Sequence, residues 1–266
     1  MLSDDDRAHL AAILECGPAL DRWRLRVQRT EPPECGSDLS ADDSVFPYHR
    51  ISEVVRTSLA ISGESLRLAT DAIHRGNLYP SAHFTALRSA LVGACQAVWI
   101  LAPGDAPTRR NRGLSVIDEA YRRSAQYHDA TKNYAPKLSA SDATALDDQL
   151  AWIATRRLQV SQARTTPIPL NLTNDVIPAA AADVYQDPQR RAEVRLLWMQ
   201  LSGDAHVLGW SMFMRSEPVM TDRLTGLIEF AARGSVKSIA QPFIASYEIL
   251  RQGWSLYDKR CEGRDA

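Results

Sequence analysis

Several polar side chains lie on helix faces that are otherwise apolar. Polar groups in such places must form hydrogen bonds within the protein or with a ligand, so they are candidates for a binding site. On a helical wheel, Arg88 lies about 40° from Phe84 and next to Trp99. Its guanidinium must leave water when that face packs, and an unpaired buried charge costs several kcal/mol. We therefore expect Arg88 to be mostly buried and to donate hydrogen bonds to another element. The expected acceptors are the segment 202–206, with the Ser202 hydroxyl, or Asp118.

Together these positions predict a polar pocket between helices, with tryptophans as its walls. The candidate binding residues are Arg88, Trp99, His128, Trp198, Ser202, His206 and Trp210. In a second interpretation the same residues serve packing alone. Ser202 would let a neighbouring helix approach, His206 would be a hydrogen-bonded core histidine, and Arg88 would bind carbonyl groups at helix ends. Both interpretations stay open on the sequence.

The sequence lacks the common signatures of metal and cofactor sites. It contains neither the glycine-rich GxGxxG pattern nor GxxxxGK[ST], and its four cysteines form no CxxC pair. A ferritin-like di-metal site needs Glu-x-x-His on inward helix faces. This chain has Glu-x-x-Arg instead, which predicts ion pairs one helical turn apart on solvated faces. These pairs are Glu53/Arg56, Glu64/Arg67, Glu119/Arg122 and Glu248/Arg251. We predict no metal and no cofactor.

A His-Asp dipeptide, His128-Asp129, resembles the metal-binding pair of HD-type phosphohydrolases. Such enzymes need further ligands on other helices, for which His83 and Asp204 could be nominated. The glycine that usually follows the pair is absent, and a lone dipeptide often occurs by chance. We do not adopt this assignment.

Three Arg-His spacings resemble the catalytic mark of HEPN ribonucleases, which are small helical domains. The pairs are Arg67/His74, Arg122/His128 and Arg123/His128. Because arginine is abundant in the chain, chance alone predicts about two such pairs. A basic groove would favour this alternative, and its members would be Arg109, Arg110, Arg112, Arg122 and Arg123.

The composition indicates an ordinary globular protein. Hydrophobic residues make up 45% of the 266 residues, charged residues 24%, and the formal net charge is −1. This balance gives no electrostatic reason to expect nucleic acid or an anionic membrane as a partner. The acidic start of the chain does not resemble a signal peptide, and no apolar run reaches about 18 residues. We expect a cytoplasmic protein that binds no membrane.

Helical periodicity dominates the chain, and alternating strand patterns are almost absent. The expected fold is all-α, a single bundle of about seven helices with one long crossover at 165–187 that holds a short helix at 179–184. We expect residues 1–48 to form an N-terminal helix and an irregular arm, and residues 49–260 to form the bundle. The expected helices span 4–29 with a break near Gly17-Pro18, 49–75, 80–101, 108–133, 139–164, 188–213, 221–233 and 235–259.

Three segments together resemble a family of uncharacterised helical proteins common in actinobacteria. The segments are Ser81-Ala-His-Phe-Thr-Ala-Leu-Arg-Ser-Ala-Leu91, Ala97-Val-Trp-Ile-Leu-Ala-Pro103 followed by Arg109 and Arg112, and Ser202-Gly-Asp-Ala-His206 with Trp210. The likeness covers about residues 50–215. In that family a glutamate often follows the arginine by four residues, where this chain has Val92. The resemblance implies a helical fold and no assigned activity.

The leading interpretation is a non-enzymatic helical protein that binds a protein partner or a small ligand, with a homodimer as one arrangement it allows. The alternative is a HEPN-like hydrolase or ribonuclease that acts on RNA or nucleotides. Nucleic acid is expected as a partner only under that alternative. The sequence does not decide whether the protein is an enzyme.

Overall fold

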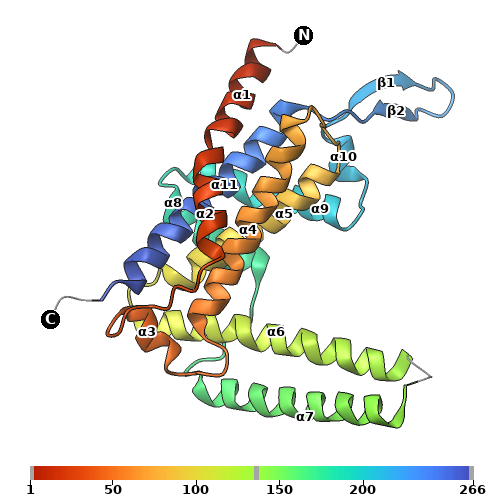
Figure 1. Ribbon diagram of the computed structural model, residues 1–266. Helices are drawn as coiled ribbons and strands as arrows, with labels where there is room; N and C mark the ends of the chain where they lie inside the picture. The colour runs from red at the N-terminus through yellow and green to blue at the C-terminus, as the bar shows by residue number, and fades with distance from the viewer. Residues whose placement is uncertain (1–2, 135–137, 264–266) are drawn as a thin grey trace. The chain divides into compact units, whose positions relative to one another are not determined.

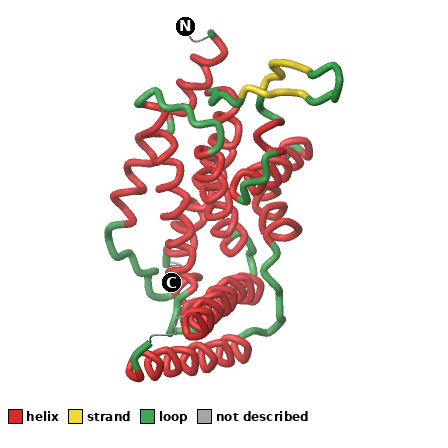
Figure 2. Tube along the Cα trace, turned by 90° about the vertical axis from the view of Figure 1, so that its right-hand side faces the viewer, coloured by secondary structure: helices red, strands yellow, loops and turns green. Residues whose placement is uncertain are grey.

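The computed structural model describes residues 3–134 and 138–263. Helix makes up 72% of the structure and strand 4%, and helices dominate the trace in Figure 2. The predicted all-α class is therefore confirmed. The predicted number of about seven helices is approximate, because short helices join the long ones.

The chain divides into two compact units, each described here by itself. Unit 1 comprises residues 1–31, 56–99 and 172–257, and unit 2 comprises residues 32–55, 100–171 and 258–266. Three of the five boundaries fall within helices labelled in Figure 1: α4 (Ile51–His74), α5 (Ala82–Leu101) and α11 (Val236–Cys261). The predicted division into an arm of residues 1–48 and a bundle of residues 49–260 stays a prediction.

Unit 1 contains the larger share of the secondary structure. Besides most of α4, α5 and α11, its elements are α1 (Asp4–Glu15), α2 (Gly17–Val27), a π-helical turn (Leu172–Val176), α8 (Ile177–Val184), α9 (Pro188–Ala205), α10 (Trp210–Phe213), β1 (Glu217–Thr221) and β2 (Ile228–Ala231). The break near Gly17-Pro18 and the short helix inside the crossover agree with the sequence-based expectations.

Small residues allow the central helices of unit 1 to approach closely. A Cβ atom on Gly93 of α5 would lie 2.5 Å from the carbonyl oxygen of Ser58 on α4, and one on Gly253 of α11 would lie 2.8 Å from Leu59. The Ser62 hydroxyl donates a hydrogen bond of 2.7 Å to the Ala90 carbonyl between the same two helices. These contacts fix the positions of α4, α5 and α11.

Helix α5 is the most apolar element. By length and composition alone it is the one helix of the described residues that could cross a membrane, and 67% of its most apolar stretch is buried. The core helix of a globular domain has the same character. Buried α5 residues such as Leu87, Leu91 and Val98 belong to the core of unit 1.

Unit 2 consists mainly of α6 (Ala106–Tyr134) and α7 (Ala140–Ala163), which pack against each other (Figure 1). A short helix, α3 (Asp38–Asp43), lies in the segment that we expected to be irregular. The Ser37 hydroxyl caps it by accepting a 3.2 Å hydrogen bond from the Ser40 amide. The polar composition of this segment predicted an irregular structure, although the segment contains a short helix with an N-terminal cap.

Residues 217–231 form an antiparallel hairpin, so the helix predicted at 221–233 is wrong. The Asp222 carboxylate accepts hydrogen bonds from the Leu224 amide at 2.8 Å and the Thr225 hydroxyl at 2.7 Å, and Gly226 closes the turn with a φ of +69°. Aspartate and glycine at these positions favour a tight turn over a helix. This two-stranded sheet lies in a part of the chain where the sequence showed no alternating strand pattern.

Burial of His83 makes the stability of unit 1 depend on pH. Desolvation lowers the pKa of His83 below its ordinary value of 6.5, and its Nε2 lies 3.0 Å from the Asn77 carbonyl oxygen. Because the unfolded chain binds the proton more readily, the free energy of unfolding should fall as the pH drops below 6.5. Urea unfolding at a series of pH values measures this slope.

His83→Gln should reduce that slope, whereas His74→Gln at the exposed end of α4 should leave it as it is. His49 of unit 2 also has a pKa lowered by burial, so part of the slope should remain in His83→Gln. A slope identical in the parent and His83→Gln would contradict the assignment.

Candidate functional site

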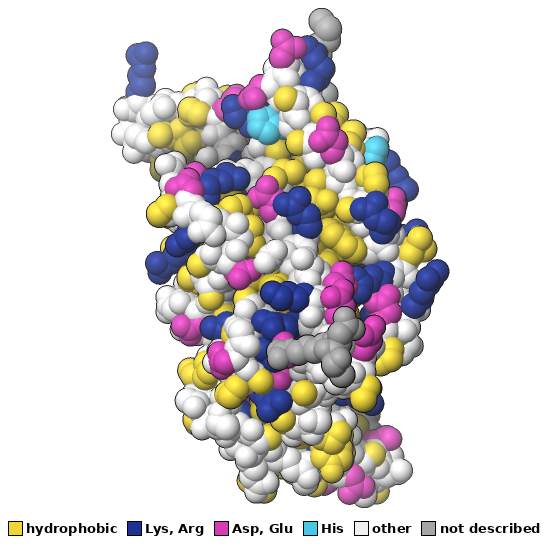
Figure 3. All heavy atoms as spheres, turned by 90° about the vertical axis from the view of Figure 1, so that its left-hand side faces the viewer, with side chains coloured by type: hydrophobic (Ala, Val, Ile, Leu, Met, Phe, Trp, Pro, Cys, Tyr) yellow, Lys and Arg dark blue, Asp and Glu magenta, His cyan; other side chains and the backbone are white. Residues whose placement is uncertain are grey.

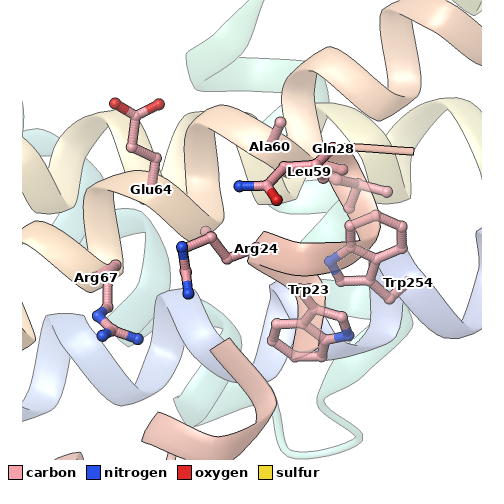
Figure 4. A pocket seen from close by; sticks show the side chains of 10 residues that line it. Trp23, Arg24, Gln28, Leu59, Ala60, Glu64, Arg67 and Trp254 are labelled. Atoms are coloured by element: carbon pink, nitrogen blue, oxygen red, sulfur yellow. The ribbon is translucent and has the colours of Figure 1, made fainter. Parts of the chain in front are cut away.

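A pocket of about 270 Å³ lies between α2, α4 and α11 of unit 1. We call it the tryptophan pocket, and Figure 4 shows the side chains that line it. The lining residues are Trp23, Arg24, Val27, Gln28, Leu59, Ala60, Gly63, Glu64, Arg67 and Trp254. All of them lie in unit 1, so the pocket belongs to one compact body.

Two indole rings form the aromatic end of the tryptophan pocket. The rings of Trp23 on α2 and Trp254 on α11 are stacked, with centroids 6.2 Å apart and planes at 18°. The guanidinium of Arg26 lies 4.6 Å from the Trp254 ring centre and is held by Glu31 at 2.6 Å. A planar apolar group could extend this aromatic stack.

Charged side chains border the other end, away from the indoles (Figure 4). Arg67 forms ion pairs with Asp21 and with Asp71, the latter at 2.9 Å. Arg24 reaches Asp21 only at 4.0 Å, and its side chain is 55% exposed. The pocket therefore offers one guanidinium that is weakly engaged by the protein.

A hydrogen-bond donor beside the tryptophan pocket lacks an acceptor. Trp254 is 2% exposed, and its Nε1 is buried without an acceptor among the described residues. Leaving a buried donor unsatisfied costs about 1–3 kcal/mol. Because this nitrogen is not exposed, it does not offer a hydrogen bond to a ligand in the pocket.

Gly63 leaves space at the wall that α4 contributes. A Cβ atom there would meet only Leu250 Cδ2, at the ordinary contact distance of 3.9 Å. A methyl group therefore fits at this position, while a longer side chain would extend beyond that contact. Since Gly63 lines the pocket, a longer side chain would occupy its volume.

The structure brings together three of the residues proposed from the sequence. Arg88 Nε donates a long hydrogen bond of 3.4 Å to Ser202 Oγ, the acceptor that the sequence predicted. Its guanidinium lies 4.9 Å from the Trp198 ring centre. Trp198 in turn donates from Nε1 to the Thr173 hydroxyl at 3.1 Å. Most of the Arg88 surface is buried, with a small part exposed, so the expectation that it is mostly buried is confirmed.

The remaining predicted residues lie in different environments. Trp99 is buried in α5, whereas His206 and Trp210 are exposed after the end of α9. His128 belongs to α6 of unit 2, where its ring contacts Tyr127 edge-on. None of these residues lines the tryptophan pocket. Whether the predicted residues form a binding site stays a prediction.

On a helical wheel Asp204 lies away from the apolar face that contains Trp198, which predicts an exposed side chain, but the structure buries it. Its carboxylate is buried and binds Arg215 through both oxygens, at 2.6 and 3.0 Å. The guanidinium also donates to the Pro80 carbonyl at 3.2 Å and lies 3.5 Å from the Phe84 ring centre. Helix α9 ends at Ala205, and Val207 has a φ of 59°, so the predicted continuation to residue 213 is broken.

Of the four ion pairs predicted from the Glu-x-x-Arg spacing, the structure shows Glu119/Arg122. Arg122 binds Glu119 through two nitrogens, at 2.6 and 2.7 Å. The other predicted pairs bind different partners. Arg56 forms an ion pair with Glu31, Arg67 forms ion pairs with Asp21 and Asp71, and Glu248 accepts a hydrogen bond from the Tyr185 hydroxyl.

Carboxylates neutralise much of the basic cluster proposed for unit 2. Arg109 is 2% exposed and binds Asp42 at 2.8 Å, and Arg110 binds the same aspartate at 2.9 Å. Arg123 shares Glu119 with Arg122. On the face drawn in Figure 3, basic and acidic side chains are interspersed. A continuous basic groove is therefore not supported around these arginines.

Comparisons with known proteins add no assignment. No family model matches the chain, and no curated protein or solved structure matches it. Within residues 3–134 and 138–263, no group of three or more histidine, cysteine, aspartate or glutamate side chains could hold a metal ion. The resemblance to the actinobacterial helical family stays a prediction, and the geometry of the pocket has to carry the functional argument.

Proposed function

We propose that the protein binds a small organic anion with a planar apolar body in the tryptophan pocket. The observation that carries this proposal is an apolar cavity of about 270 Å³ with stacked indoles at one end and the weakly paired Arg24 at its border. The proposal is a specific form of the leading sequence-based interpretation, a non-enzymatic binding protein.

The size and lining of the pocket favour a ligand of one or two fused rings. Pockets for small molecules usually measure about 300–1,000 Å³ and are mostly apolar with a few convergent polar groups. At about 270 Å³ the tryptophan pocket lies just below that range, and Val27, Leu59 and Ala60 supply apolar walls. A flat ring system would fill this space without burying polar atoms against carbon.

The polar groups favour an anionic end on the ligand. Arg24 and Arg67 contribute two positive charges to the lining, and Glu64 contributes one negative charge. Arg24 has the weaker protein partner, so a ligand carboxylate could engage its planar guanidinium in a bidentate manner. A cationic ligand would find only Glu64 as a lining partner.

The first test compares two probes that differ only in charge, β-naphthoate and β-naphthamide. Equilibrium dialysis should show tighter binding of the carboxylate to the parent. Arg24→Gln should weaken β-naphthoate binding about fivefold, the effect of roughly 1 kcal/mol from an exposed charge pair. It should leave the binding of the neutral amide nearly unchanged.

Arg22→Gln is the matched control, because Arg22 lies on the same helix, is exposed and does not line the pocket. Equal loss of naphthoate binding in both variants would show a general effect of charge. Equal affinity of the parent for the two probes would contradict the anionic part of the proposal.

A further inference from the structure

The hairpin β1–β2 exposes a set of apolar side chains that its own unit does not cover. It projects beyond the neighbouring helices of unit 1 in two views (Figures 1 and 2). Leu224 at its tip is 96% exposed. The other exposed apolar residues of the hairpin and of the segment before it are Val207, Leu208, Trp210, Phe213, Met214, Val219, Met220, Leu227, Ile228 and Phe230.

A two-stranded hairpin is at best marginally stable in water unless another element covers it. Here the Phe213 and Phe230 rings stack at 5.4 Å and attach the hairpin to α10. The turn is held by the Asp222 carboxylate. The described residues supply a two-stranded sheet only, so each strand has one outer edge without a partner strand.

The two outer edges differ in their capacity to pair. Strand β1 contains Pro218, which has no N–H group, and its register shifts between Pro218 and Met220. Proline and bulges are features that protect a strand edge from pairing. Strand β2, Ile228–Ala231, contains neither proline nor glycine and has a regular register. The edge of β2 is therefore the open one.

The charged residues next to this edge would face residues of opposite charge in a second copy related by a twofold axis. Glu229 and Arg233 are both exposed and lie at equal sequence distances on either side of Ala231. In an antiparallel pair centred on Ala231, Glu229 of each copy faces Arg233 of the other copy. A pair centred on Glu229 would instead oppose like charges, which is unfavourable.

The ladder would also have a defined end. Gly234 packs so closely on Leu78 that a Cβ atom there would overlap the Leu78 carbonyl. The chain is thus fixed to the body of unit 1 immediately after Arg233. Pairing can extend β2 by two residues, through Arg233, and stops there.

We propose that a second copy of this chain docks on the β2 edge, forming a twofold dimer through antiparallel pairing of the segment 229–233, centred on Ala231. Glu229 and Arg233 form two equivalent interchain ion pairs, and the exposed apolar residues beside the strand are covered in the dimer. An interface of this type is isologous and closes on itself. The inference does not depend on the tryptophan pocket.

Sedimentation equilibrium of the full-length chain tests the proposal. The parent should dimerise, and Glu229→Arg and Arg233→Glu should each raise the dimer dissociation constant by about tenfold or more, because each places like charges opposite one another. An equimolar mixture of these two variants should form a heterodimer, since it restores both ion pairs. The double variant Glu229→Arg/Arg233→Glu should dimerise like the parent.

Arg223→Glu in the hairpin turn is the control, because it alters an exposed charge of the same hairpin away from the proposed edge. A parent that stays monomeric at about 100 µM, far above the dissociation constants of specific dimers, would overturn the proposal. So would single variants that dimerise as the parent does, or a mixture that fails to associate. Circular dichroism checks that each variant is folded, and β-naphthoate binding should be the same in all of them.

Discussion

Replacing Arg109 by methionine should lower the free energy of unfolding by about 3–5 kcal/mol, the usual cost of breaking a buried ion pair from one side. Arg109 Nε donates to Asp42 at 2.8 Å, and its Nη1 donates to the carbonyls of Pro103 and Gly104 at 3.2 and 3.0 Å. The Asp42 side chain is fully buried. Methionine would fill much of the volume but leave that carboxylate and both carbonyls without these donors.

Urea unfolding followed by circular dichroism gives the measurement. Arg110→Met is the matched control, because Arg110 binds the same carboxylate but its side chain is 33% exposed. Its loss should cost about 1 kcal/mol or less, as expected for a solvent-accessible ion pair. The double variant Arg109→Met/Asp42→Leu should recover part of the stability lost in Arg109→Met, because it removes the buried carboxylate that has lost its buried partner and retains only the partly exposed Arg110. Equal costs for Arg109→Met and Arg110→Met would contradict this account.

Arg109 belongs to a set of groups that terminates α5 in unit 2. Arg260 donates to the carbonyls of Leu101 and Pro103, at 3.2 and 2.9 Å, and pairs with Asp38 at 2.6 Å. Carbonyl groups at the end of a helix lack partners within the helix. Two buried arginines satisfy them here, and the aspartates of the α3 segment balance the charge.

Much of the helical structure was predictable because long amphipathic patterns and caps are local signals. Helices α4, α5, α6 and α7 lie where their periodicity placed them, to within a few residues. The hairpin was missed because apolar residues also recur there at helical spacing, at Leu224, Leu227, Ile228 and Ala231. The turn formed by Asp222 and Gly226 was the signal that could have identified it.

A helical wheel of a single helix could predict which polar residues need a partner, but in most cases not which residue supplies it. The wheel correctly indicated that Arg88 needs an acceptor, and Ser202 supplies it. It gave the wrong environment for Asp204, because Arg215 comes from a segment beyond the end of that helix. Asp42 lies in a segment that looked irregular, so its pairing with Arg109 could not be foreseen.

The tryptophan pocket was missed for a related reason. Trp23 and Trp254 are separated by most of the chain, and neither lies in a recognisable motif. Their stacking depends on how α2 and α11 pack, which no local pattern encodes. A tryptophan within a helix carrying Arg22, Arg24 and Arg26 was the available signal, since cations often accompany exposed aromatic rings.

Filling the tryptophan pocket from Gly63 should abolish ligand binding without unfolding the protein. In Gly63→Leu the added side chain extends beyond the Cβ position, which is itself free of clashes. Glycine is roughly 0.8–1.0 kcal/mol less favourable in a helix than alanine, and leucine ranks close to alanine, so α4 should not be weakened. Gly63→Ala is the matched control, because it makes the same backbone change and adds only a methyl group that meets Leu250 at 3.9 Å.

Calorimetric titration of these two variants and the parent with β-naphthoate tests the central claim most directly. The parent and Gly63→Ala should each bind one molecule of the probe per chain. In Gly63→Leu the dissociation constant should rise by more than about tenfold, since the probe and the leucine side chain compete for one volume. Circular dichroism spectra of the three proteins should agree. A parent that binds no β-naphthoate, or a Gly63→Leu variant that binds it as the parent does, would contradict the assignment of this pocket as a ligand site.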